Sequence, residues 1–277
     1  MGRSRRVRHN TWMFRQCRAE VPTASVDIAT RLPAPPDTGA DDRWALFLDV
    51  DGTLLDFAHH PDSVVVAPHL HDDLARLRER LDGAIALLSG RSLSQLDQLF
   101  DWNRHVAAGL HGAQLRTPDG NVRTTGDPAA FAQARMRAAE LVSKARGVLL
   151  EDKRLALALH YRRAPAAREA AERIAETLLQ DVGASHVLQH GDHVIELKPA
   201  GVDKGRALAA LMQQQPFRGR TPWMLGDDLT DEHAFRHVNA DGGVSVIVGA
   251  RRPTEARCAL DNPAAVRAWL HGLTTTK

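Results

Sequence analysis

The sequence is poor in cysteine and aromatic residues and has no long apolar run. Its two cysteines, Cys17 and Cys258, are too few for a disulfide framework or a cysteine-based zinc site, and they fit a reducing cytoplasm. No stretch approaches the roughly 18 consecutive apolar residues that a membrane span requires, so we expect a soluble protein without a membrane partner. Aromatic residues make up only 5% of the chain and form no platform on which nucleic-acid bases could stack.

Positive charge is concentrated near the amino terminus. Residues 1–20 carry six arginines and one glutamate, a net charge of +5 that leaves the remaining residues at −3 within the total of +2. Such a run is most often a solvated tail, and a nucleic-acid-binding arm is the weaker alternative because no RNA-binding signature accompanies it. Ser4, Arg5 and Arg6 hint at a twin-arginine export signal, but no apolar segment follows them. We therefore expect a cytoplasmic protein with no nucleic-acid partner.

The order of apolar segments predicts an α/β fold. After a tail and linker over residues 1–42, the folded part is expected to begin near Trp44. Short apolar runs at residues 45–48 and 84–88 alternate with amphipathic stretches. One of these spans residues 68–81 and repeats leucine at three- and four-residue steps, which is helical spacing. A β-α-β-α-β order indicates a Rossmann-like, mostly parallel sheet with helices on both faces.

The middle of the chain changes character. Residues 114–198 contain two Ala-rich helical segments, each followed by alternating, strand-like sequence, which predicts an α+β module of two helices and several strands. The parallel pattern then resumes. We therefore expect a first domain formed by residues 43–113 and 199–277, interrupted by a second domain at 114–198.

Polar residues stand where the predicted parallel strands end. In such sheets, ligands bind at the carboxyl ends of the strands. Carboxylates from two strand ends would form a negative cluster that a hard divalent cation stabilises, and Mg²⁺ is the natural choice because it takes oxygen ligands and keeps substrate phosphate in its coordination sphere. The residues concerned are Asp49 and Asp51, then Ser89, Gly90 and Arg91, then His111 and Gly112, and finally Asp227 and Asp228.

These groups can together transfer a phosphoryl group. Asp49 could attack phosphorus to form an acyl phosphate, while Asp51 protonates the leaving oxygen and later deprotonates water. Lys204, at a predicted helix start, would balance the charge, and Ser89 offers a hydroxyl and an N–H to phosphate oxygens.

Each of these motifs also has a purely structural interpretation. An isolated Asp-x-Asp-Gly is most often a turn or a calcium-loop fragment. Asp228 and Asp231 could be the cap and first turn of a helix, and Lys204 could be a solvated lysine. The order Asp-x-Asp, Ser, Lys, Asp-Asp, each at a predicted strand end or helix start, favours the catalytic interpretation.

The motifs resemble those of the haloacid dehalogenase superfamily of phosphotransferases. FLDVDGTL at residues 47–54 resembles its nucleophile motif, LLSGR at 87–91 its Ser/Thr motif, Lys204 its phosphate-binding lysine, and MLGDDLTDE at 224–232 its acidic motif. The resemblance implies that Asp49 is the nucleophile, that Asp51 is the acid/base, and that Mg²⁺ is held by Asp49, the Asp51 carbonyl and Asp227, with Asp228 and Asp231 beside the metal site. It also implies that the inserted α+β module is the superfamily's cap domain, with phosphate bound by Ser89, Gly90 and Lys204.

Within that superfamily the chain is similar to the trehalose-6-phosphate phosphatase family over most of residues 44–272. The more specific stretches are GLHGAQLR, LEDKRLALALHYR and IELKPAGVDKGRAL. The similarity implies hydrolysis of trehalose 6-phosphate, a functional link with a trehalose-phosphate synthase, and a protein that we expect to be a monomer. The substrate-binding residues that it implies are Arg91, His111, Gly112, Glu151, Lys153, Arg162 and Glu196.

Two positions depart from the family pattern. Gln114 stands where glutamate is usual, and Asp192 stands where a lysine is common. The second departure changes the charge beside the sugar, so another sugar phosphate stays open as the substrate. A non-catalytic sugar-phosphate sensor is the alternative from another class of protein, and the presence of both a nucleophile and an acid/base argues against it.

Overall fold

The computed structural model describes residues 32–37, 43–56, 66–102, 105–129, 131–191 and 193–275. Most of the predicted basic tail therefore lies outside the described residues. Residues 32–37 join the fold, although we expected the folded part to begin near Trp44. Leu32 packs against the main core, and the Ala259 N–H donates to the Pro33 carbonyl oxygen at 2.9 Å.

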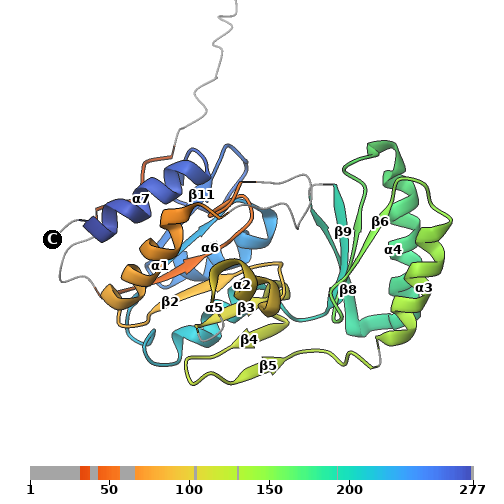
Figure 1. Ribbon diagram of the computed structural model, residues 1–277, viewed down its shortest axis with the longest axis horizontal. Coiled ribbons are helices and arrows are strands. Elements are labelled where there is room, and N and C mark those ends of the chain that lie inside the picture. Colours follow the sequence, from red (N-terminus) through yellow and green to blue (C-terminus); the bar gives the residue numbers. More distant parts are fainter. Residues whose placement is uncertain are drawn as a thin grey trace, which may run out of the picture. The chain divides into compact units, whose positions relative to one another are not determined.

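The first domain is built on an eight-stranded sheet with the strand order β12-β11-β10-β1-β2-β3-β4-β5 (Figure 1). The pairs from β12 to β3 are parallel, as the sequence predicts. Every residue of β1 and β2 is buried, which is what helices on both faces of a parallel sheet require. The strands are β1 (Trp44–Leu48), β2 (Ile85–Leu88), β3 (Ala107–Gly109), β4 (Gln114–Arg116), β5 (Val122–Thr124), β10 (Thr221–Gly226), β11 (Val244–Val248) and β12 (Cys258–Leu260).

The first sheet continues beyond residue 114, where the sequence predicts that the inserted module begins. Strands β4 and β5 pair antiparallel with β3 and with each other, so residues 114–124 extend the first sheet rather than opening the inserted module. Strands of three residues are too short to show a diagnostic alternation, and β5 is exposed throughout. The pairing depends on the tight turn that reverses the chain after β3.

The helices of the first domain follow the amphipathic patterns. Leu70, Leu74 and Leu77 are buried along α1, which confirms the predicted helix. Helix α1 packs against α7, and α5 packs against α6. Among the described residues, no helix is both long and apolar enough to cross a membrane. The helices are α1 (Pro68–Arg80), α2 (Leu93–Phe100), α5 (Lys204–Met212), α6 (Glu232–Ala240) and α7 (Pro263–Thr275), with short 3₁₀ segments η2 (Leu110–Gly112) and η5 (Leu229–Asp231).

The inserted part, residues 131–199, is called the cap module below. Its four antiparallel strands have the order β6-β7-β9-β8, and Figure 1 shows α3 and α4 side by side on one face of this sheet. Phe131, Ile174 and Leu178 belong to an apolar cluster separate from the core of the first domain, so the module has its own interior. Its elements are α3 (Ala132–Ser143), β6 (Leu149–Asp152), β7 (Leu157–His160), η3 (Pro165–Ala167), α4 (Arg168–Val182), η4 (Gly183–Ser185), β8 (His186–Gly191) and β9 (Val194–Pro199).

Candidate active site

Asp49 follows directly after β1 and lies at the carboxyl end of the sheet. Its N–H donates to the Leu225 carbonyl oxygen of β10 at 2.9 Å, which joins the ends of two neighbouring parallel strands. Asp227 follows β10, so this pairing brings two acidic residues 178 positions apart in the sequence to one edge. The side chain of Asp49 is buried.

Lys204 neutralises part of this acidic cluster. It is the first residue of α5, whose N-cap Asp203 accepts the Arg206 N–H. The ammonium lies 2.5 Å from Asp49 Oδ1 and 2.7 Å from Asp231 Oδ1, and the residue is only 2% exposed. Burial by itself lowers the pKa of Lys204, but the two carboxylates outweigh it and hold the pKa above its usual range. Lys204 is thus a fixed cation beside Asp49.

The acidic loop after β10 adds two more carboxylates. Asp231 is fully buried, and its Oδ2 accepts the N–H groups of Asp227 and Asp228, both at 3.0 Å. Burial, together with the Asp49 carboxylate, raises the pKa of Asp231 to about 6. Burial and the carboxylates of Asp49 and Asp231 raise the pKa of Asp227 to about 9. Asp228 is the N-cap residue of η5, and its backbone carbonyl oxygen accepts the Asp231 N–H at 3.1 Å.

The cluster fits a divalent cation. Within the described part of the chain, one carboxylate oxygen from each of Asp49, Asp227 and Asp231 lies within 4.8 Å of the other two. The Lys204 ammonium lies among three acidic side chains, and the raised pKa of Asp227 reflects the excess of carboxylates over cations there. An all-oxygen donor set of this kind suits a hard divalent cation. Asp231, which we expected beside the metal site, contributes to this cluster of carboxylates, and the Asp51 backbone carbonyl stays a predicted ligand.

Asp51 lies in the turn after β1, and its carboxylate faces Arg91. The Arg91 guanidinium donates from Nε to Asp51 Oδ2 at 2.7 Å and from Nη2 to Oδ1 at 2.6 Å, a two-point contact that fixes the orientation of the carboxylate. Ser89 is buried between these elements, and its Oγ accepts the Arg91 N–H at 3.1 Å. Arg91 was expected to contact substrate, and its contact with Asp51 was not predicted.

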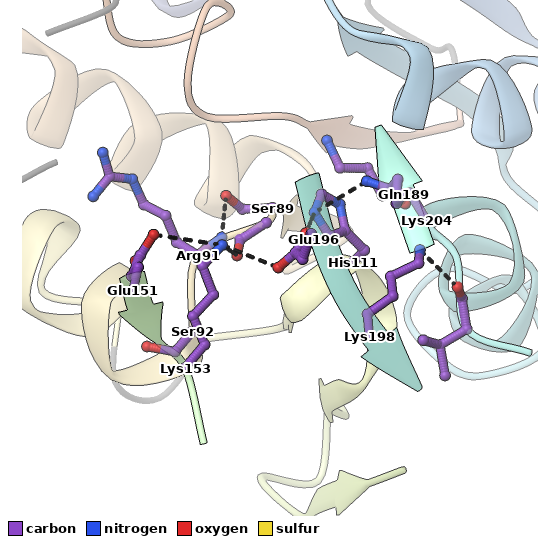
Figure 2. A network of polar contacts seen from close by, with 12 residues as sticks. Ser89, Arg91, Ser92, His111, Glu151, Lys153, Gln189, Glu196, Lys198 and Lys204 are labelled. Carbon is purple, nitrogen blue, oxygen red and sulfur yellow. Dashed lines mark hydrogen bonds and ion pairs between the residues drawn. The ribbon is translucent and has the colours of Figure 1, made fainter. Parts of the chain in front are cut away.

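The cap module contributes a second group of charged residues that face the same loop. Lys153 donates to Glu196 Oε1 and to the Gly90 carbonyl oxygen, both at 3.1 Å, and thereby links the cap module to the Ser89–Arg91 segment (Figure 2). Its ammonium is 3.9 Å from Glu151 Oε2, which also contacts the His160 ring at 2.9 Å. The structure therefore brings Glu151, Lys153 and Glu196 together, as expected. Arg162 lies in the exposed turn that follows β7.

Glu196 joins both parts of the site. Its Oε2 lies 2.8 Å from His111 Nε2. Burial alone would raise the pKa of Glu196, but the Lys153 ammonium and His111 outweigh it and hold the pKa well below its usual range. Burial also lowers the pKa of His111 despite the nearby carboxylate, which favours the neutral ring, with Nε2 placed to donate to Glu196. Lys153 therefore supplies the charge that keeps Glu196 ionised, and His111 supplies a hydrogen bond.

The backbone around His111 is strained. Leu110, His111 and Gly112 have φ values of 51°, 55° and 105°, and only glycine adopts the last without cost. A β-carbon on Gly112 would meet the Asp203 carbonyl oxygen at 2.9 Å, so this turn packs tightly against the residue before Lys204. The strained turn is what aims His111 at Glu196. Within the described residues His111 Nδ1 is a buried atom without a hydrogen-bond partner, which agrees with a neutral ring.

Three residues near the site have roles that the sequence did not reveal. Gln114, one of the two departures from the family pattern, accepts the Leu93 N–H at 3.0 Å and so caps the start of α2. Lys198 is buried on β9 and donates to the Val202 carbonyl oxygen at 3.1 Å (Figure 2). It stands two residues after Glu196, and this spacing on a strand could have indicated a shared face. Arg251 contacts the backbone of the acidic loop. Asp192, the other departure from the family pattern, lies outside the described residues.

The fold is that of the haloacid dehalogenase-like proteins, with an α/β cap. Several solved structures share the fold, among them the C-terminal domain of C. albicans trehalose-6-phosphate phosphatase, with a TM-score of 0.74 and 23% identity over 88% of this chain and 98% of that one. A haloacid dehalogenase-like hydrolase from Bacteroides thetaiotaomicron superposes with a TM-score of 0.61, at 14% identity, over 84% of this chain and all of that one.

Sequence similarity narrows the class to one family. Residues 47–264 match the trehalose-phosphatase family. The chain is 43% identical over 233 residues to a probable trehalose-phosphate phosphatase of Sinorhizobium fredii, covering 84% of this chain and 88% of that one. It is 42% identical to the trehalose-6-phosphate phosphatase of Escherichia coli, covering 84% and 87%. The chain belongs to the trehalose-phosphatase family.

Proposed function

We propose that the protein hydrolyses trehalose 6-phosphate to trehalose and phosphate, with Mg²⁺ as the cation and a covalent aspartyl-phosphate intermediate. The observation that carries the proposal is the contact between Lys153 and the Gly90 carbonyl oxygen. It places the polar groups of the cap module beside the loop that holds Ser89 and Arg91, and Arg91 in turn holds Asp51. Groups suited to sugar hydroxyls thus face groups suited to phosphoryl transfer.

In the first step, an Asp49 carboxylate oxygen forms a bond to phosphorus, and the ester bond between phosphorus and the sugar oxygen breaks. Asp51 gives a proton to that sugar oxygen, so trehalose leaves as a neutral alcohol. Lys204 stabilises the negative charge on the transferring group, and Ser89 offers its hydroxyl to a phosphate oxygen. In the structure both Asp51 oxygens accept from Arg91, so Asp51 gives up one of these contacts when it carries the proton that it passes to the sugar oxygen.

In the second step, Asp51 takes a proton from water, and the water oxygen attacks phosphorus. The bond between phosphorus and Asp49 breaks, which releases phosphate and restores the carboxylate. Mg²⁺, held by Asp49 and Asp227 with the Asp51 carbonyl or with Asp231 beside them, would neutralise phosphate charge when it is bound. The cap module would exclude water during the first step.

The cap module supplies the recognition of the sugar. Glu151 and Glu196 are acceptors and Lys153 is a donor, so together they can hydrogen-bond adjacent hydroxyls. In the structure these side chains contact one another, and binding would exchange those contacts for sugar hydroxyls. We further propose that His111 and Gly112 form a hinge of the cap module, and that the protein is a cytoplasmic monomer linked functionally to a trehalose-phosphate synthase.

The test is phosphate release from trehalose 6-phosphate beside glucose 6-phosphate and sucrose 6-phosphate, with Mg²⁺ and with a chelator. We expect release from trehalose 6-phosphate alone, lost on chelation and in Asp49→Asn. Asp241→Asn, an exposed position at the end of α6, is the matched control and should keep full activity. Preference for another sugar phosphate would contradict the substrate but keep the mechanism. Absence of release from all three would favour a sugar-phosphate sensor.

A further inference from the structure

The acidic loop, which consists of Asp227 and Asp228 between β10 and η5, is held on one side by Asp231. The Asp231 Oδ2 atom accepts the N–H groups of Asp227 and Asp228 at 3.0 Å each. The same carboxyl group occupies the place where a β-carbon on Gly226 would lie, so the loop backbone and Asp231 are in close contact. Asp231 therefore holds the backbone N–H groups of the loop in place.

Arg251, in the segment between β11 and β12, holds the backbone carbonyl oxygens of the loop in place. Its Nε donates to the Asp227 carbonyl oxygen at 3.0 Å, and its Nη2 donates to the Asp228 carbonyl oxygen at 3.3 Å. The planar guanidinium can contact two successive carbonyl oxygens at once, which a lysine ammonium cannot do with the same geometry. Both peptide groups that flank the Asp227 side chain are thus hydrogen-bonded.

Arg251 is itself anchored by Glu232. Its Nη2 contacts Glu232 Oε1, and the other Glu232 oxygen accepts the Glu255 N–H at 2.7 Å. Glu232 is buried and the Arg251 side chain is 25% exposed, so the pair is partly shielded from solvent and orients the guanidinium. Arg251 Nη1 also donates to the Pro253 carbonyl oxygen at 3.3 Å. The chain of contacts runs from the β11–β12 segment through Arg251 to the backbone of Asp227.

We propose that Arg251 is a positioning residue for the metal site: by holding the backbone of Asp227, it aims the Asp227 carboxylate toward Asp49 and thereby raises the affinity for Mg²⁺. This inference rests on the proposed function, because it takes Asp227 as a metal ligand. Residues that orient metal ligands usually affect metal affinity on the order of 10- to 100-fold. Arg251 does not contact the reacting atoms in this arrangement.

Charge and geometry have opposite effects, which makes the choice of variant decisive. A guanidinium near a cation site repels the cation, so loss of its charge alone would strengthen Mg²⁺ binding. Loss of its two carbonyl contacts would weaken binding. Arg251→Lys keeps the charge and a partner for Glu232 but cannot reproduce the two-point contact. Arg251→Gln removes the charge as well.

The experiment measures Mg²⁺ binding by titration calorimetry on metal-free full-length protein, without substrate, for wild type, Arg251→Lys and Arg251→Gln. Arg252→Lys is the matched control, because it makes the same chemical change at the exposed neighbouring residue. We expect the Mg²⁺ dissociation constant to rise on the order of tenfold in Arg251→Lys and to stay within about twofold of wild type in Arg252→Lys. The melting temperature without Mg²⁺ should be close to that of wild type in both lysine variants.

A second readout separates positioning from general support of the fold. At saturating Mg²⁺, the KM for trehalose 6-phosphate should be unchanged in Arg251→Lys, while the Mg²⁺ concentration for half-maximal activity should rise with the dissociation constant. An Arg251→Lys protein that binds Mg²⁺ as tightly as wild type would overturn the inference. So would a lowered melting temperature without any change in Mg²⁺ affinity. If wild type binds Mg²⁺ but releases no phosphate, the proposed function is wrong. The positioning role of Arg251 is then still decided by the Mg²⁺ dissociation constants of wild type and Arg251→Lys.

Discussion

Replacing Lys204 with methionine removes a cation that joins two buried carboxylates. Asp49 and Asp231 are 4% and 0% exposed, and each accepts a hydrogen bond from the Lys204 ammonium. Removing one member of a buried ion pair typically costs about 3–5 kcal/mol, because the remaining charge stays buried without its partner. Melting temperatures of domains of this size fall by about 2–4 °C per kcal/mol, so Lys204→Met should melt roughly 6–20 °C below wild type.

The measurement is thermal unfolding by circular dichroism or calorimetry without added metal. Lys198→Met is the matched control, since Lys198 is also a buried lysine but donates to the Val202 carbonyl oxygen. Burial lowers the pKa of Lys198, and its removal should cost no more than about 1 kcal/mol. Equal losses in the two variants, or a Lys204→Met protein that melts with wild type, would refute the reasoning that the carboxylate contacts decide the effect.

The remaining predictions concern other parts of the site. Asp49→Asn should lower the rate of phosphate release at least about a thousandfold, as expected for loss of a nucleophile, and a variant within about tenfold of wild type in the same assay would contradict that role. Because the folded-state pKa of Glu196 lies below its ordinary value of 4.5, its stabilising contribution is present above that pH and is lost as the pH falls. In urea unfolding from about pH 6 down to about pH 3, wild type should therefore lose stability more steeply than Glu196→Gln, and parallel curves would exclude this linkage. Gln114→Ala should cost about 1 kcal/mol in the same experiment, because the Leu93 N–H at the start of α2 loses its acceptor. Gln114→Glu should keep the acceptor and add about 0.3–1 kcal/mol of stability, and a loss would count against the capping role.

The parallel part of the fold was predictable because its signal is local. Short buried strands, the leucine spacing of α1 and the polar residues after β1, β2 and β10 are visible within a few positions of one another. A parallel sheet then requires that the residues after neighbouring strands meet, which is why Asp49 and Asp227 were expected at one edge. The α+β character of the cap module followed from the same kind of pattern.

Contacts between distant residues were not predictable in this way. Nothing around Asp51 shows that its carboxylate faces Arg91, because the direction of a side chain in a turn depends on the whole fold. The contact of Arg251 with Asp227 spans 24 positions and carries no sequence motif. The boundary at residue 114 was misplaced because β4 consists of three residues, and its partner is specified by the strained turn at His111 rather than by alternation.

Covalent transfer of the phosphoryl group to Asp49 is the central claim, and acid-quenched labelling tests it most directly. The protein would be mixed with Mg²⁺ and trehalose 6-phosphate carrying a radioactive phosphorus, quenched at short times, and digested to locate the label. We predict label on the peptide that contains Asp49, released by hydroxylamine as an acyl phosphate should be, and absent from Asp49→Asn. Label on another residue, or undiminished phosphate release by Asp49→Asn, would contradict the account.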